Sequence, residues 1–419
     1  MRQVLHGHII HAPELGKLEI IENGYMHLED GRIAGLGQEL LPGWADGERV
    51  DYGDRLIMQS FCDMHLHAPQ YPMLGMGMDL PLLEWLNTYT FKTEARFKDV
   101  DYAREVYRRL AQELVSNGTT RVCAFSSLHL ESTRVLMEEF EKAGICGYVG
   151  KVNMDRNGSP ELEETTEDSI RDTIAWLDGC DPSAHIQPIL TPRFTPSCTD
   201  ELMAELGRLA KARGLRVQSH LSENTSEIAW VRELHPDCPQ YWESYEKYGL
   251  FGSHTVMAHC VHSDAREREA IRRNNVVVAH CPDSNINLIS GVAPIRRMLD
   301  EGIWVTLGSD IAGGAILPMM GVIASAIRSS KVRRISENWG VDFLTVAEGY
   351  YLGTTSGAKY FGSGNGFACG DGLHAIVIDD RHYVDTGRLS VRDRFERAIY
   401  RADANDIKAV YSEGRKIKG

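Results

Sequence analysis

The sequence lacks the features that mark nucleic-acid-binding, membrane and secreted proteins. No run of Lys and Arg stands out and the formal net charge is −14 at pH 7, whereas nucleic-acid surfaces need clustered cations that neutralise phosphates. No window approaches the roughly 18 consecutive apolar residues of a membrane span, and the N-terminus lacks the basic head and apolar core of a signal peptide. We therefore expect a cytoplasmic protein that binds a small molecule, with no nucleic acid and no membrane as partner.

Cysteine pairs at short spacing are also missing. The nine cysteines are scattered from Cys62 to Cys369 without a C-x-x-C pair, which disfavours a disulfide framework and indicates reduced, buried thiols. With 419 residues, of which 43% are hydrophobic, the chain can bury one large α/β barrel or the cores of two or three ordinary domains.

The order of residue patterns divides the chain into a β-rich start, an alternating middle and a β-rich end. Residues 1–58 alternate apolar and polar residues between turn signals, which predicts short antiparallel strands. From about residue 101, segments with helical spacing precede short apolar runs, as where Val106, Leu110 and Leu114 come before TTRVCAF. Repeated units of this kind predict a parallel sheet. Short strands return after about residue 365, so we infer that the two ends form one small β domain.

Two histidines one residue apart mark a candidate metal site. His65 and His67 lie in the stretch SFCDMHLHAPQYP, and alternate residues of a strand point to the same face, so both imidazoles can reach one ion. An isolated H-x-H pattern is more typical of two partly exposed surface histidines than of a metal site. A mononuclear catalytic site needs three or four nitrogen and oxygen ligands and a position left for water, so further ligands have to come from other strands.

Four polar residues end other predicted strands: His220, His259, His280 and Asp310. They follow one another at roughly the length of a βα unit. In a (β/α)8 barrel the carboxyl ends of all strands surround one mouth, where such residues can meet, whereas an open sheet would spread them along a line. His220 and Asp310 suit the remaining ligand positions. His259 and His280 can each be a ligand, a substrate contact or a core histidine.

Glu223 follows His220 by three positions, close enough to reach a group held at a metal. A glutamate at this place is commonly a solvated residue at the start of a helix. Beside a metal-activated water it becomes a candidate proton carrier.

These motifs resemble those of the amidohydrolase superfamily. The superfamily pattern is carried by DMHLH (63–67), SHLSE (219–223), MAH (257–259) and GSD (308–310), in the order expected of strands one, five, six and eight. Within it, the chain is similar to the guanine deaminase family in HAPQY (67–71), DLPLLEWLNTYTF (79–91), GKVNMDRN (150–157), TPRF (191–194), HLSEN (220–224), AHCPDSN (279–285) and GSDIAGG (308–314).

The resemblance implies a fold, a reaction and a set of roles. The fold is α/β: a distorted (β/α)8 TIM barrel over residues 59–365, with a small β-sandwich domain formed by residues 1–58 and 366–419. The reaction is hydrolytic deamination of guanine, a purine base, to xanthine and ammonia, in a homodimer with one zinc ion per chain or iron(II) in its place. The implied metal ligands are His65, His67, His220 and Asp310; the implied catalytic residues are Glu223, Asp310 and His259; the implied substrate contacts are Gln70, Arg193, Phe194, His220 and His259.

Some residues keep a second interpretation. Arg193 could be a surface charge and Phe194 a core residue, and the apolar spacing around Trp85 favours a helix buried against the barrel over a wall of the pocket. Lys151 could bridge two metals as a carbamylated lysine only if it ended the fourth strand. Counting from His65 places it on the third, so we predict one metal.

Two rival functions remain. The same scaffold could act on another heterocycle, such as cytosine, adenine, 8-oxoguanine, a pterin or a triazine, or it could have become a non-catalytic binding protein. The zinc deaminases that act on nucleosides and nucleic acids combine H-x-E with P-C-x-x-C, and this combined signature is absent because the sequence contains no P-C-x-x-C.

Overall fold

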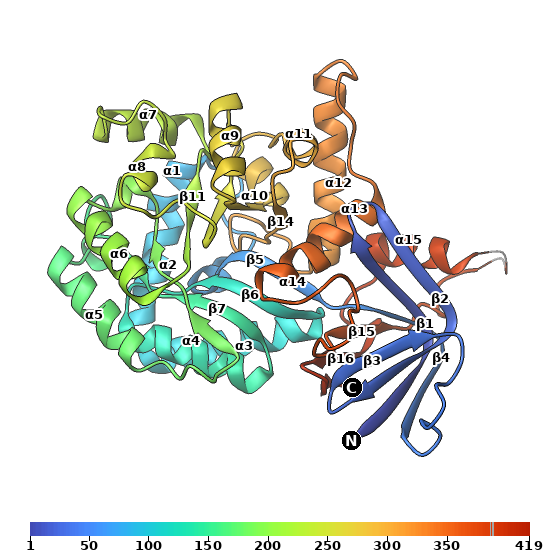
Figure 1. Cartoon of the computed structure of the whole chain (residues 1–419). Coiled ribbons are helices and arrows are strands. Elements are labelled where there is room, and N and C mark those ends of the chain that lie inside the picture. The colour runs from blue at the N-terminus through green and yellow to red at the C-terminus, as the bar shows by residue number, and fades with distance from the viewer. Residues whose placement is uncertain (386, 388) are drawn as a thin grey trace.

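The computed structural model describes residues 1–385, 387 and 389–419. It consists of a barrel of parallel strands and, beside it, a sheet built from both ends of the chain (Figure 1). The barrel strands form two four-stranded sheets: β5 (Phe61–His67), β6 (Thr119–Phe125), β7 (Cys146–Gly150) and β9 (Ile186–Pro188), then β11 (Val217–Leu221), β12 (Thr255–His259), β13 (Val277–His280) and β14 (Val305–Leu307). A short pair, β8 (Val152–Asn153) with β10 (Thr191–Pro192), extends the third and fourth strands.

The two sheets close into a barrel at two seams. A parallel bridge joins Leu190, after β9, to Val217 of β11. At the other seam the backbone N–H of Asp310 donates to the carbonyl of His65 at 2.8 Å, and the Asp63 carboxylate accepts hydrogen bonds from the backbone N–H and the hydroxyl of Ser309. The predicted α/β barrel is confirmed, and its closure brings the first and last strands together.

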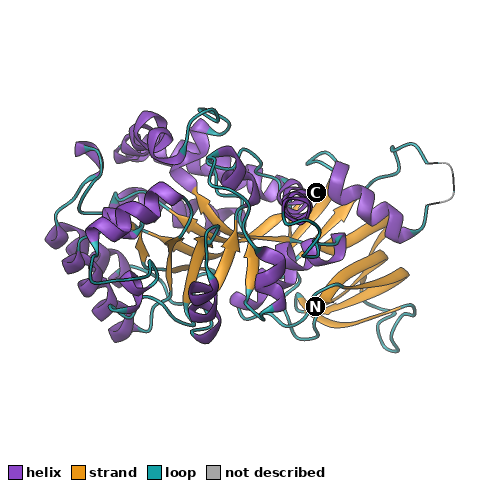
Figure 2. Ribbon diagram, turned by 90° about the horizontal axis from the view of Figure 1, so that it is seen from above, coloured by secondary structure: helices purple, strands orange, loops and turns teal. Residues whose placement is uncertain are grey.

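Helices cover the outside of the barrel strands (Figure 2). Helix α3 shows why they form: Asp99 caps its N-terminus by accepting hydrogen bonds from the N–H groups of residues 101 and 102, and its apolar stripe is buried. The longer helices are α3 (Val100–Ser116), α4 (Leu130–Ala143), α5 (Thr166–Asp178), α6 (Asp200–Arg213), α7 (Thr225–Leu234), α9 (Ala265–Arg273), α12 (Met319–Ser336) and α15 (Val391–Arg401). The shorter ones are α1 (Leu82–Trp85), α2 (Phe91–Ala95), α8 (Glu243–Glu246), α10 (Pro282–Asn287), α11 (Ile295–Asp300), α13 (Val346–Tyr351) and α14 (Gly357–Tyr360).

Both ends of the chain contribute to the second domain, as predicted. Its strands are hydrogen-bonded as one seven-stranded sheet in the order β17 (Arg415–Lys418), β16 (Ile407–Ser412), β15 (Ala375–Ile378), β4 (Glu48–Gln59), β1 (Arg2–Glu14), β2 (Lys17–Glu29) and β3 (Arg32–Gly37). Strands β1 and β4 pair in parallel, while the other neighbours are antiparallel. Only Ser60 separates β4 from barrel strand β5. The domain boundaries expected near residues 58 and 366 stay predictions.

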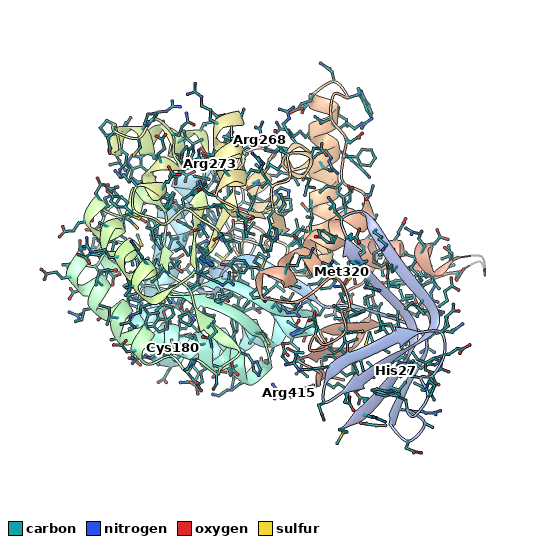
Figure 3. The ribbon with its side chains drawn as sticks, in the orientation of Figure 1. His27, Cys180, Arg268, Arg273, Met320 and Arg415 are labelled. Carbon is teal, nitrogen blue, oxygen red and sulfur yellow. The ribbon has the colours of Figure 1, made fainter. Side chains whose placement is uncertain are left out.

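The cysteines are mostly buried, as the sequence predicts, with two exceptions. All nine cysteines lie in the described part of the chain and are free; seven are buried, Cys180 is half-buried on the outer side of the barrel (Figure 3) and Cys369 is exposed. None of the described helices combines the length and the apolar character that crossing a bilayer requires.

Candidate active site

The barrel brings the four predicted metal ligands together at the carboxyl ends of its strands. His65 and His67 belong to β5, His220 to β11, and Asp310 follows β14 by three residues. Asp310 Oδ1 lies 3.2 Å from His65 Nε2 and 3.6 Å from His67 Nε2. His67 Nε2 lies 3.1 Å from His220 Nε2. Four side chains from three strands thus direct their ligand atoms at one point.

These side chains fit a divalent metal. Within the described chain, buried His65 Nε2 has no hydrogen-bond partner, and ligand atoms of His65, His67 and His220 lie within 4.8 Å of one another. Burial and the neighbouring imidazoles hold the pKa of His67 and of His220 well below the ordinary histidine value, so both rings are neutral, as ligands must be. His220 Nδ1 donates to the carbonyl of Arg193 at 2.6 Å, which leaves Nε2 free for a metal. The buried histidine cluster therefore has the atoms and the protonation state that a metal site requires.

Glu223 and His259 lie beside this cluster. Glu223 is 4% exposed, and burial, followed by the charge of Asp310, raises the pKa of its carboxyl to about 8. Its carboxylate Oε2 lies 3.5 Å from His259 Nε2, which lies 3.8 Å from Asp310 Oδ2. The solvated helix-start interpretation of Glu223 is wrong, because the side chain turns inward ahead of α7.

Asn285 orients His259. Asn285 ends the motif AHCPDSN, but the sequence assigns it no role. The Asn285 Oδ1 atom lies 2.9 Å from His259 Nδ1. An amide oxygen only accepts, so Nδ1 carries the proton and donates it, and Nε2 faces Glu223 and Asp310. His259 also has a φ of 72° and Asp310 a φ of 49°, a left-handed conformation that is costly outside glycine and concentrates at functional sites.

A pocket opens next to the cluster, with about 420 Å³ of empty space that includes the part open to solvent. Its polar wall contains His67, Gln70, Arg193, His220, Glu223, His259 and Asp310, and apolar side chains form the remainder: Leu82, Trp85, Leu86, Phe194 and Leu288. A concave site that combines an apolar wall with a few polar groups suits a small-molecule ligand. The predicted substrate contacts all line it.

Arg193 and Gln70 meet at a third buried residue, Glu94, which sequence analysis did not identify. Glu94 is 2% exposed and lies on α2. Its carboxylate accepts hydrogen bonds from Arg193 Nη1 at 2.5 Å and Nη2 at 3.0 Å, and from Gln70 Nε2 at 2.8 Å. Arg193 is 3% exposed, so the surface-charge alternative is wrong. The only sequence signal for Glu94 is its place three residues after the stretch 79–91.

The remaining candidates take other places. Trp85 is 2% exposed, as a buried helix predicts, yet it also lines the pocket, so the two interpretations hold together. His280 is buried, and burial lowers its pKa to about 3; it is not among the pocket-lining residues. Lys151 follows β7, the third barrel strand, and pairs with Glu164 at 2.9 Å, away from the histidine cluster.

Comparison with known proteins gives full-length matches. Residues 56–414 match the amidohydrolase family. The chain is 36% identical to guanine deaminase from Dictyostelium discoideum, over 99% of this chain and 98% of that protein, and 34% identical to guanine deaminase from Homo sapiens, over 99% and 93% respectively. It is also similar to the crystal structure of guanine deaminase from C. acetobutylicum with bound guanine in the active site, with a TM-score of 0.97, 41% identity, and coverage of 99% of this chain and 100% of that one.

Proposed function

Because the chain belongs to the amidohydrolase family, and within it to the guanine deaminases, we propose that it hydrolyses guanine to xanthine and ammonia. It is a hydrolase that acts on the C–N bond of a cyclic amidine. The observation that carries the proposal is the joint presence, in one pocket, of the histidine cluster, the buried acid Glu223, and the polar pair of Gln70 and Arg193.

One metal ion per chain is part of the proposal. His65, His67, His220 and Asp310 would hold it, and their nitrogen and oxygen atoms suit zinc, with iron(II) as the alternative. When bound, such an ion lowers the pKa of a water molecule toward neutrality and so supplies the nucleophile. Lys151 is held by Glu164 on the third strand, which supports one ion rather than two.

Three residues are proposed to handle protons. Glu223, whose pKa of about 8 keeps it protonated at neutral pH, donates to the ring nitrogen beside the carbon under attack. Asp310, a carboxylate directed at the same point, accepts the proton that the attacking water releases. His259 orients the water and the tetrahedral intermediate through Nε2, because Asn285 fixes its other nitrogen.

Recognition of the base is assigned to the opposite wall. Arg193 donates from its guanidinium to the carbonyl oxygen of guanine, and the amide of Gln70 contacts the purine edge. Phe194, which is 8% exposed, offers a ring face for stacking. His220 and His259 complete the contacts near the reacting carbon.

Ammonia release from a panel of bases tests the proposal. Purified, metal-replete protein is incubated separately with guanine, cytosine, adenine, 8-oxoguanine and a pterin. Release from guanine alone is the expected result. Release from another base would leave the fold and metal site in place but overturn the roles of Gln70, Arg193 and Phe194. The absence of ammonia release from every base would favour a non-catalytic binding protein.

We also propose a homodimer that works in the cytoplasm. Exposed apolar side chains in the last turns of α12 and just after it support self-association: Val332 is 53%, Ile335 60% and Trp339 66% exposed. This end of α12 projects from the body of the protein (Figure 1). Light scattering on the purified protein should give twice the chain mass. The mass of a single chain would refute the dimer.

A further inference from the structure

The carboxylate of Glu94 is the shared partner of the two side chains proposed to contact the purine edge. Arg193 uses both terminal nitrogens on it, and Gln70 donates to it from Nε2. Phe91, one turn earlier on α2, lies below the guanidinium, with the Arg193 Cζ atom 5.3 Å from the ring centroid. One short helix therefore holds Arg193 in a fixed position.

The same contacts fix the orientation of the Gln70 amide. Its Oε1 accepts the backbone N–H of Ala312 at 2.9 Å, while Nε2 donates to Glu94. A flipped amide would place oxygen against carboxylate and nitrogen against an N–H donor, so both contacts would be lost. One amide hydrogen and one lone pair of Gln70 remain for a ligand.

Charge gives Glu94 a second effect. Arg193 and Glu94 are 3% and 2% exposed, so solvent screens their charges little, and the guanidinium is balanced mainly by this carboxylate. An unbalanced buried guanidinium would attract anions. The reaction itself supplies one, because replacing the exocyclic amine of guanine by a second carbonyl makes the ring N–H groups of xanthine more acidic than those of guanine.

We propose that Glu94 is a specificity-determining positioning residue: it fixes Gln70 and Arg193 and neutralises the guanidinium, so that the pocket favours a neutral purine over an anionic one. This rests on the proposed function, because xanthine is its product. Because Glu94 balances the charge of Arg193, the guanidinium does not retain xanthine, and the product can leave even at a pH at which xanthine ionises. Nothing in the motifs around Glu94 indicates this role; it follows from the contacts alone.

Binding of two purines tests the proposal without turnover. The affinities of metal-replete protein for xanthine and for hypoxanthine, which lacks the second carbonyl, are measured by calorimetry below and above the pH at which xanthine ionises. In Glu94→Gln the preference for xanthine over hypoxanthine should rise about tenfold or more above that pH, and little below it, because an uncompensated buried charge selects ligands by charge. An unchanged preference at both pH values would overturn the proposal.

Two further variants separate charge from position. Glu94→Asp keeps the charge but shortens the reach, so it should keep the wild-type preference and lower kcat/KM for guanine; a preference like that of Glu94→Gln would refute the charge argument. Arg193→Gln leaves the Glu94 carboxylate without its cationic partner, so the preference for xanthine over hypoxanthine should fall. This variant keeps the proposal testable if Glu94→Gln fails to fold.

Glu139→Gln is the matched control. Glu139 is 6% exposed and pairs with Arg104 at 2.9 Å and Lys142 at 3.1 Å, but it lies on α4 outside the pocket, so its loss should leave the preference unchanged. If wild-type protein released no ammonia from guanine, the proposed function would fail, while the binding preference would still report on Glu94.

Discussion

Replacing Glu223 by glutamine removes one transferable proton from the pocket and changes little else. The amide has nearly the shape of the protonated carboxyl, and its oxygen can still accept the hydrogen bond that Ser290 Oγ donates at 3.3 Å. With a pKa of about 8, roughly nine in ten Glu223 side chains hold a proton at pH 7, against fewer than about one in a hundred at the ordinary pKa of glutamate. Glu223 is thus ready to act as an acid at neutral pH.

The expected cost follows from that role. A positioned general acid contributes about 10²–10⁴ in rate, which corresponds to about 3–5 kcal/mol of activation free energy. Glu223→Gln should therefore retain its metal and lose most of kcat. In the wild type, activity should be present below pH 8 and fall as the pH rises through about 8, because the acid form is then lost.

The assay is ammonia release from guanine, with the metal content of each sample measured in parallel. Glu267→Gln is a close control: Glu267 is 3% exposed, its pKa is raised to about 7 mainly by burial, and it accepts hydrogen bonds from Ser222 and Ser263 without lining the pocket. A Glu223→Gln rate within a few fold of the wild type, with metal retained, would remove Glu223 from the mechanism.

Three more outcomes are expected. Asn285→Ala removes the acceptor for His259 Nδ1, so kcat should fall about 10–100-fold at unchanged metal content; Ser284→Ala is the neighbouring control, and equal losses would mean a packing effect. Folded Glu267 binds its proton more tightly than the unfolded chain does, so this group makes wild-type stability fall as pH rises from about 4.5 to 7. Between pH 5 and pH 8, the free energy of unfolding of Glu267→Gln, measured with urea, should rise by roughly 2–3 kcal/mol relative to that of the wild type. The same difference between the two proteins at both pH values would contradict the burial argument. Chelation should abolish ammonia release, and one zinc ion per chain should restore it; a requirement for two would refute the single-metal site.

The sequence predicts the meeting of the four candidate ligands because the histidines among them follow the period and the ends of strands. His65 and His67 share a face through the two-residue period of a strand, and His220 lies within a strand that ends at the same mouth of the barrel. Asp310 lies beyond the end of β14, in a left-handed conformation. Its approach to the histidines depends on the seam between the first and last strands, which only the closed barrel creates.

The wall that is proposed to contact the base is less predictable. Glu94 comes from a five-residue helix between two barrel strands, and it meets Arg193, which is 99 positions away in the chain. No period or spacing encodes that approach. Trp85 shows a related limit, because apolar spacing predicts burial but does not tell whether the buried face borders core or pocket.

The hydrogen bond from His220 to the carbonyl of Arg193 joins the two halves of the site through a single residue. The backbone of Arg193 orients a proposed metal ligand, while its side chain lines the pocket. Any shift of this residue on metal loading would therefore pass directly to the guanidinium. A metal-depleted form should discriminate poorly among purines, and a bound base should in turn slow the loss of metal. Retention of the metal and selection of the substrate therefore both depend on how firmly Arg193 is held.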